Sequence, residues 1–145
     1  MSDKIETRLF VSADLAAGAT VGLETGQTHY LKHVLRLGPG ARVALFNGRD
    51  GEWVAEIDGI GKGWTSLTLI SQSRPQRTEP DIWLAFAPIK RARIDFTAQK
   101  ATELGVSILQ PVMTARTVVT RVKEDRLAAN AVEAAEQCER LDVPE

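Results

Sequence analysis

The sequence predicts two domains of different class, a small β-barrel or sandwich followed by the opening part of a parallel α/β sheet. Three strand-like runs follow one another at regular spacing over residues 41–46, 52–58 and 64–70. The stretch 71–80 is polar and contains two prolines, which is typical of a domain boundary. After residue 80 the pattern changes to apolar runs that alternate with helical periods, as expected of an α/β domain.

The first domain is expected to be built mainly from strands and turns. A β-branched and aromatic run at 7–12 predicts its opening strand. Apolar residues recur near helical spacing over 28–37, with Thr28 as the expected N-cap of a helix. The connectors 47–51 and 59–63 are rich in residues that tolerate positive φ, so both predict hairpin loops. The second connector resembles a phosphate-binding glycine loop, but strand-forming residues follow it instead of a helix.

The second domain predicts strand, helix, strand and helix in that order. The four segments are residues 81–88, 91–104, 106–112 and 124–140. The first of them is a nearly continuous apolar run, which predicts a strand buried on both faces. Two parallel strands and two helices cannot close a typical α/β core, so we expect a fragment or a sheet that something else completes. The expected domain boundaries are 1–73, 74–80 for the linker, and 81–145.

Composition excludes several classes of protein. The net charge is -1, so the surface is not basic throughout, although a local basic patch remains possible. The single cysteine, Cys138, excludes an internal disulfide framework and a Cys-rich zinc module. The N-terminus is too charged for a signal peptide, and no apolar run reaches the roughly 20 residues that span a bilayer. We therefore expect a cytoplasmic protein without a membrane partner.

Charge is distributed unevenly along the second half of the chain. Residues 88–123 contain seven basic and two acidic side chains, whereas residues 124–145 contain two basic and seven acidic ones. The basic segment could bind a phosphate backbone, because Arg makes bidentate contacts with phosphate. A solvated surface with compensating charges explains the same pattern equally well.

Two groups of polar residues are candidates for a functional site. Glu133, Gln137 and Arg140 have helical spacing and are expected to form one stripe opposite the apolar face of their helix. Such a stripe could bind the edge of a uracil or orient a cofactor, or it could be an ordinary exposed helix face. His29 and His33 have the spacing of metal ligands, but no third ligand is evident nearby, so no metal is predicted.

Four motifs in order resemble one enzyme family, the 16S ribosomal RNA uridine N3-methyltransferases. The most specific is QKATELGV at Gln99–Val106. RLFV at Arg8–Val11 resembles the opening strand of the family, and HVLR at His33–Arg36 with FNG at Phe46–Gly48 resembles its N-terminal domain. The segment EAAEQCER at Glu133–Arg140, followed by Val-Pro, resembles a further family motif. The resemblance covers essentially the whole chain.

The resemblance implies a PUA-like RNA-binding β-barrel followed by a SPOUT-type methyltransferase domain with a C-terminal trefoil knot. It also implies S-adenosylmethionine as methyl donor, a uridine in 16S rRNA of the small ribosomal subunit as target, and a homodimer. The catalytic positions that match the family are Arg116, Glu133, Gln137 and Arg140. The positions expected to contact RNA or to support such contact are Arg8, His33, Arg36, Lys90, Arg93 and Lys100.

The match ends before two segments of the family, a Gly-Pro-Glu-Gly-Gly loop and a Leu-Arg-x-Glu-Thr-Ala segment, which build the knot and hold the cofactor. We therefore expect an incomplete SPOUT domain with the knot absent, and no cofactor-binding residue is assigned. Glu133 is the candidate general base for the N3 proton of uridine, and Arg116 or Arg140 could stabilise charge on the uracil oxygens. The alternative hypothesis is an RNA-binding module without catalysis. A nucleotide-binding α/β protein of another type is the weakest of the three hypotheses.

Overall fold

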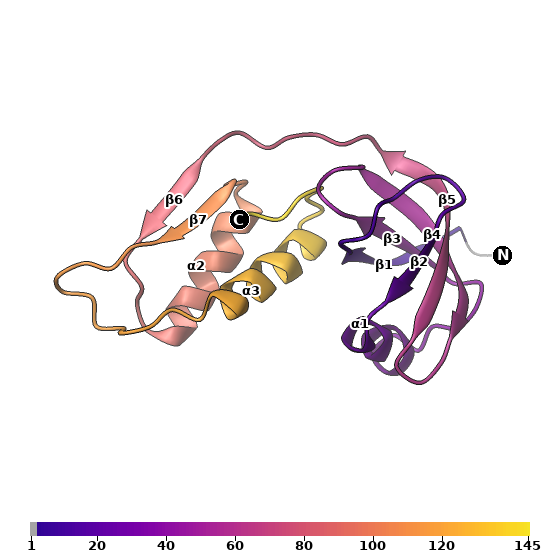
Figure 1. Cartoon of the computed structure of the whole chain (residues 1–145), viewed down its shortest axis with the longest axis horizontal. Helices are drawn as coiled ribbons and strands as arrows, with labels where there is room; N and C mark the ends of the chain where they lie inside the picture. Colours follow the sequence, from indigo (N-terminus) through magenta and orange to yellow (C-terminus); the bar gives the residue numbers. More distant parts are fainter. Residues whose placement is uncertain (1–2) are drawn as a thin grey trace. The chain divides into compact units, whose positions relative to one another are not determined.

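The computed structural model describes residues 3–145, which fold as two compact units. The first unit ends at Arg77, and the second runs from Thr78 to Glu145. Figure 1 shows a β-rich first unit and a second unit in which two helices accompany a short sheet. In the described part of the chain, no helix is long and apolar enough to cross a membrane.

The first unit contains a five-stranded mixed sheet. Its strands are β1 (Ile5–Phe10), β2 (Thr20–Leu23), β3 (Arg42–Phe46), β4 (Glu52–Ile60) and β5 (Thr65–Arg74). The strand order is β1-β3-β4-β5-β2, with β1 parallel to β3 and the other pairs antiparallel. This pairing leaves β1 and β2 at the two edges. The predicted barrel is therefore not confirmed, because no pairing among the described strands joins the edges into a closed ring.

Alternate residues of the central strands form the core of the first unit. The register pairs Ala55 with Leu69 and Ile57 with Leu67, so these side chains point to the same face of the sheet. Val43 and Leu45 of β3 are fully buried in the same cluster. The alternation along β5 thus explains which of its faces is buried, whereas β3 is buried on both faces from Val43 to Phe46.

The predicted helix at 28–37 begins earlier and has a different form. The structure has α1 at Thr25–His29 and then a π-helical turn, η1, at Tyr30–Val34. Thr28 is not the N-cap, because its hydroxyl is buried inside the unit at 2.8 Å from the hydroxyl of Thr65. A buried hydroxyl needs a hydrogen-bonding partner, and β5 supplies it.

Glu52 joins three strands at the edge of the first unit. Its carboxylate accepts hydrogen bonds from Arg8 Nε at 2.6 Å, Arg74 Nη2 at 2.8 Å and Ser73 Oγ at 2.8 Å. The Arg8 guanidinium also lies 4.5 Å from the ring centroid of Phe46. Burial alone would raise the pKa of Glu52, but the hydrogen bonds from Arg74, Arg8 and Ser73 outweigh it and lower the pKa to about 2.

The second unit has the predicted order of strand, helix, strand and helix. Its elements are β6 (Trp83–Phe86), α2 (Arg91–Glu103), β7 (Ile108–Pro111) and α3 (Glu124–Gln137). β6 and β7 pair in parallel, with Trp83 opposite Ile108 and Phe86 opposite Pro111. The opposite edge of β7 is paired too, because the amide of Leu109 donates to Glu145 and the amide of Glu145 donates to Ser107.

The prediction that residues 81–88 form a strand buried on both faces is wrong. Trp83 is 59% exposed and Ile82 is 53% exposed, and no residue of β6 itself is fully buried. Among the described residues, β6 has one neighbouring strand and lies at the edge of a two-stranded sheet. The apolar run therefore predicted the strand correctly. It did not predict the burial of the strand, because burial depends on the elements that cover it.

Both helices of the second unit end in Schellman motifs. After α2, Gly105 has φ 95° and the amide of Val106 donates to the carbonyl of Ala101. After α3, Glu139 has φ 65° and the amide of Arg140 donates to the carbonyl of Ala135. The positive φ turns the chain after the helix and directs the residue that follows toward the protein.

The prediction that Arg140 shares one helix stripe with Glu133 and Gln137 is wrong, because the positive φ of Glu139 ends the helical spacing before Arg140. Arg140 follows the end of α3 and is only 6% exposed. Its Nη1 donates to the carbonyls of Thr102 and Val106, both at 2.9 Å, and its Nη2 lies 2.9 Å from Asp142. Arg140 therefore binds the carboxyl end of α2, where the helix dipole favours a cation.

We expect substitution of Glu52 to destabilise the first unit in a pH-dependent manner. Because its pKa is lower in the folded state than the ordinary 4.5, Glu52 stabilises the fold above pH 4.5, by about 3 kcal/mol at pH 7. This stabilisation is lost as the pH falls from 4.5 toward 2. Urea unfolding followed by the NMR signals of β4 should show a large deficit for Glu52→Gln at pH 7 that shrinks at pH 3.

The matched control is Glu56→Gln on the same strand, whose side chain is 42% exposed in its pair with Arg42. Its effect should stay below about 1 kcal/mol at every pH, because exposed ion pairs contribute little. Equal deficits for the two variants at pH 7 would contradict the role given to Glu52.

Arg140→Gln should destabilise the second unit by about 2–4 kcal/mol, because it removes the hydrogen bonds from the buried guanidinium to the carbonyls of Thr102 and Val106 and leaves Asp142 without its ion pair. The readout is hydrogen exchange of the α2 amides, which should accelerate. Arg116→Gln, at an exposed position, is the control and should change stability by less than about 0.5 kcal/mol. If the two variants exchanged alike, Arg140 would have no special structural role.

Candidate functional site

Small side chains bring the two helices of the second unit together. Ala98, Ala101 and Thr102 of α2 are buried, as are Ala131 and Ala135 of α3. Small residues at helical spacing allow two helix backbones to approach closely. Polar side chains on either side of this contact are therefore presented on facing edges of two neighbouring helices.

An ion pair links the amino-terminal halves of the helices. The carboxylate of Asp95 accepts two hydrogen bonds from Arg126, from Nε at 2.8 Å and from Nη2 at 2.5 Å, and a third from Asn130 Nδ2 at 2.8 Å. The hydrogen bond from Arg126 lowers the pKa of Asp95, and the same bond raises the pKa of Arg126. These two hydrogen bonds fix the orientation of the Arg126 guanidinium relative to the Asp95 carboxylate.

A pocket of about 360 Å³ lies on one side of the pair, and we call it the helix groove. Its lining residues are Ala92, Asp95, Phe96, Gln99, Asn130, Glu133, Ala134 and Gln137. Phe96 is 60% exposed, and the ammonium of Lys100 lies 5.8 Å from its ring centroid. The groove thus combines an exposed aromatic ring with three side-chain amides and two carboxylates, a set that can stack on a base and hydrogen-bond its edge.

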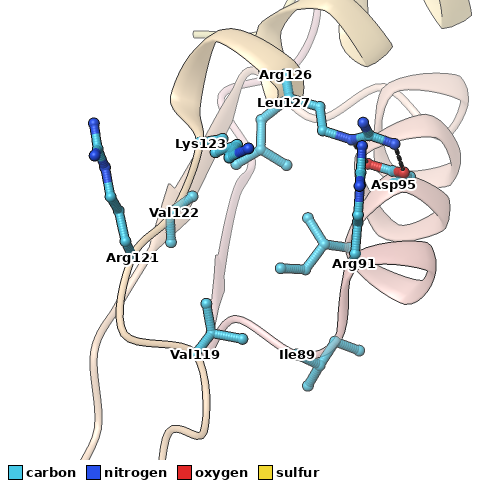
Figure 2. A pocket seen from close by; sticks show the side chains of 10 residues that line it. Ile89, Arg91, Asp95, Val119, Arg121, Val122, Lys123, Arg126 and Leu127 are labelled. Carbon is cyan, nitrogen blue, oxygen red and sulfur yellow. Dashed lines mark hydrogen bonds and ion pairs between the residues drawn. The ribbon is translucent and has the colours of Figure 1, made fainter.

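A second pocket, of about 220 Å³, lies on the other side of the pair, and we call it the loop pocket. Its lining residues are Ile89, Arg91, Ile94, Asp95, Val119, Arg121, Val122, Lys123, Arg126 and Leu127. Figure 2 shows Arg91 and Arg126 together on the helix side of this pocket, with Arg121 on the loop across from them. Apolar side chains thus line the interior, and basic side chains surround it.

The structure brings together two of the four predicted catalytic residues. Glu133 and Gln137 are exposed and line the helix groove together. Arg140 is buried at the carboxyl end of α2, as described above. Arg116 is exposed on the segment between β7 and α3 and lines neither the helix groove nor the loop pocket.

The six predicted RNA-contacting residues fall into two groups. Arg8 and Lys100 are engaged within the protein, Arg8 with Glu52 and Lys100 with Glu103 at 3.0 Å. The other four residues have exposed side chains, and they are His33, Arg36, Lys90 and Arg93. His29 and His33 have ring centroids 4.9 Å apart, and no group of three or more potential metal ligands occurs among residues 3–145.

Sequence reasoning missed the residues that α2 contributes to the helix groove. Phe96 and Gln99 are three residues apart and share a face of α2, whereas Asn130, Glu133 and Gln137 share a face of α3. The spacing within each helix was visible, but the sequence did not indicate that the two faces meet. The QKATELGV motif begins at Gln99, and this was the one available signal for that side of the groove.

Two family models match the chain. An RNA methyltransferase PUA domain matches residues 23–63, and an RNA methyltransferase domain matches residues 76–145. Among curated relatives, Ribosomal RNA small subunit methyltransferase E of Rickettsia conorii is 36% identical over 138 residues, covering 94% of this chain and 57% of the relative. The protein of the same name from Synechocystis sp. is 34% identical over 139 residues, covering 94% and 46%. The chain thus spans about half the length of these relatives.

Solved structures give the same result. Ribosomal RNA small subunit methyltransferase E from Neisseria gonorrhoeae, bound to S-adenosyl methionine, matches with a TM-score of 0.85 and 30% identity, covering 95% of this chain and 59% of that one. A Legionella pneumophila protein in complex with the same cofactor matches with a TM-score of 0.82 and 26% identity, covering 98% and 61%. Together, the motifs, the two matched domains and these relatives show that the chain belongs to the family of RNA methyltransferases that carry a PUA domain.

Proposed function

We propose that this chain forms the RNA-facing part of an enzyme that methylates N3 of a uridine in 16S rRNA of the small ribosomal subunit. The observation that carries the proposal is the helix groove, in which Glu133 and Gln137 of α3 lie opposite Phe96 and Gln99 of α2. The names of the relatives support the small-subunit rRNA as substrate. A cytoplasmic homodimer is part of the proposal and rests on the family resemblance.

The groove offers each group that uridine N3 chemistry needs from the protein. The uracil ring stacks on Phe96, and the side-chain amides of Gln99 and Gln137 donate hydrogen bonds to its two carbonyl oxygens. The carboxylate of Glu133 accepts the hydrogen of N3 and removes it as the nitrogen becomes nucleophilic. Negative charge that develops on the uracil oxygens is then stabilised by the donating amides.

Neither the helix groove nor the loop pocket fits the methyl donor as a whole. The loop pocket contains four basic side chains and one acidic one, and a positive surrounding opposes both the sulfonium and the ammonium of S-adenosylmethionine. The helix groove is lined mainly by polar side chains, unlike the enclosed, largely apolar pocket that an adenosine moiety prefers. The donor supplies an electrophilic methyl group, and no step of that transfer is assigned to the described residues.

RNA contact is proposed for exposed basic residues of each unit. His33 and Arg36 serve this role in the first unit, and Lys90 and Arg93 serve it near the start of α2. Arg8 and Lys100 support it indirectly, since Arg8 is bound to Glu52 and Lys100 to Glu103. These contacts are electrostatic and position the RNA without reading its sequence.

The second candidate function is a module that binds RNA without taking part in catalysis. The basic loop pocket favours it, because a phosphate-binding surface requires no reaction. The two functions differ in what they require of the helix groove. A pure binding module holds the backbone, so it does not distinguish a uridine from a uridine that already carries the methyl group on N3.

We expect the chain to bind a short single-stranded RNA that contains one uridine about tenfold more tightly than the same RNA with 3-methyluridine. Methylation replaces the N3 hydrogen, so the hydrogen bond to the Glu133 carboxylate is lost, and bonds to charged groups contribute about 1.5–3 kcal/mol. Fluorescence anisotropy with the two oligonucleotides measures the ratio. Glu133→Ala should reduce the ratio to about one, and Glu133→Gln should retain part of it.

The control is Glu139→Ala, which removes a carboxylate just beyond the end of α3 and outside the groove. This variant should keep the wild-type ratio. Equal binding of the two RNAs by the wild-type chain would contradict the uridine N3 proposal and favour the module without catalysis. Loss of discrimination in Glu139→Ala as well would show that the effect does not arise in the groove.

A further inference from the structure

The loop pocket is the one feature of the second unit that the proposed chemistry does not use. We propose that it binds a second nucleotide of the RNA strand, with the base against its apolar interior and the phosphate on its basic side chains. This proposal rests on the proposed function, because it adds a contact to the same RNA. No residue of the pocket was among the positions that the family motifs indicate.

Charge is the first argument for a phosphate. Arg91, Arg121 and Lys123 form no ion pair or side-chain hydrogen bond within residues 3–145, and the Asp95 carboxylate is occupied by Arg126. The remaining charge of the pocket is therefore positive and is not compensated inside it. The acidic residues at the start of α3, Glu124 and Asp125, line a neighbouring pocket instead.

Geometry is the second argument. The cations come from three separate segments, with Arg91 on α2, Arg126 on α3, and Arg121 and Lys123 on the loop between β7 and α3. Side chains from separate segments can surround one phosphate, and Arg binds its oxygens in pairs. Figure 2 shows Lys123 and Arg91 on either side of an opening above Val119 and Ile89, whereas Arg121 extends away from the opening on the loop side.

The apolar interior is the third argument and separates a nucleotide from a simple anion. Ile94, Val122 and Leu127 provide apolar surface beneath the basic side chains. An inorganic anion gains nothing from such a surface, whereas the face of a base is desolvated against it. The volume of about 220 Å³ accommodates one base but not a duplex. The ligand is thus an unpaired nucleotide.

The shared Asp95 places this nucleotide beside the proposed uridine site. Asp95 lines both the helix groove and the loop pocket, so the two sites are adjacent. Neighbouring nucleotides of a single strand can therefore occupy both. Binding a flanking nucleotide would hold the strand in an unstacked form while the target base lies in the groove.

The test measures the salt dependence of binding to a fluorescent single-stranded oligouridylate between 50 and roughly 200 mM NaCl. Neutralising one phosphate contact lowers the slope of log K against log salt by about 0.7 for single strands. We expect this decrease for Arg91→Gln and for Lys123→Gln, with about fivefold weaker binding at the lower salt concentration. Arg77→Gln, an exposed arginine of the first unit, is the control of equal charge change and should retain the wild-type slope.

Two results would overturn the proposed nucleotide site, and a third would contradict the proposed function instead. An unchanged slope in both variants, while the oligonucleotide still binds, would remove the phosphate site but leave the proposed function intact. NMR titrations with uridine monophosphate and with inorganic phosphate should differ at Val122 and Leu127, and identical shifts would reduce the site to an anion site only. Failure of the wild-type chain to bind the oligonucleotide at all would contradict the proposed function itself.

Discussion

The paired contact between Asp95 and Arg126 is the interaction on which both candidate sites depend. It joins α2 to α3 near their amino-terminal halves, while Arg140 binds the carboxyl end of α2. Between these contacts, small buried residues set the spacing of the helices. Because Asp95 lines both pockets, loss of the pair would displace one wall of each and leave a carboxylate in the basic pocket.

The pair divides one surface into two chemical environments. On one side lie an exposed aromatic ring, amides and the Glu133 carboxylate, which suit the edge and face of a base. On the other side lie basic side chains over an apolar interior, which suit a phosphate and its nucleoside. The helix groove is lined by α2 and α3 alone, whereas the loop pocket also includes residues of the loop that precedes α3.

Local sequence patterns predicted most elements of this protein, because they depend on neighbouring residues. The periods of 3.6 and two indicated α2, α3 and the strands, and the strand–helix–strand–helix order indicated the parallel pairing. The burial of β6 was predicted wrongly, since it depends on what covers the strand. Arg140 was misplaced because helical spacing was extended through Glu139, whose positive φ ends that spacing.

The sequence predicted only the part of the candidate site that lies on a single helix. Glu133 and Gln137 could be placed on one face of a helix, but Phe96 and Gln99 belong to another helix, and their proximity is set by tertiary packing. The loop pocket lay inside the basic segment 88–123, yet charge alone did not separate a binding site from a solvated surface. Only the structure shows that Arg91 of α2 and Lys123 of the loop border the same apolar interior.

The most direct measurement is ultraviolet cross-linking of the 145-residue chain to a single-stranded RNA in which one uridine is replaced by 4-thiouridine, with the cross-linked residue identified by mass spectrometry. If the uridine is held in the helix groove, the cross-links should fall on α2 at Phe96 or Gln99, or on α3 between Asn130 and Gln137. They should decrease when Phe96 is replaced by Ala, because the stacking surface is lost. Cross-links confined to the first unit, with none on either helix, would contradict the assignment of the uridine site.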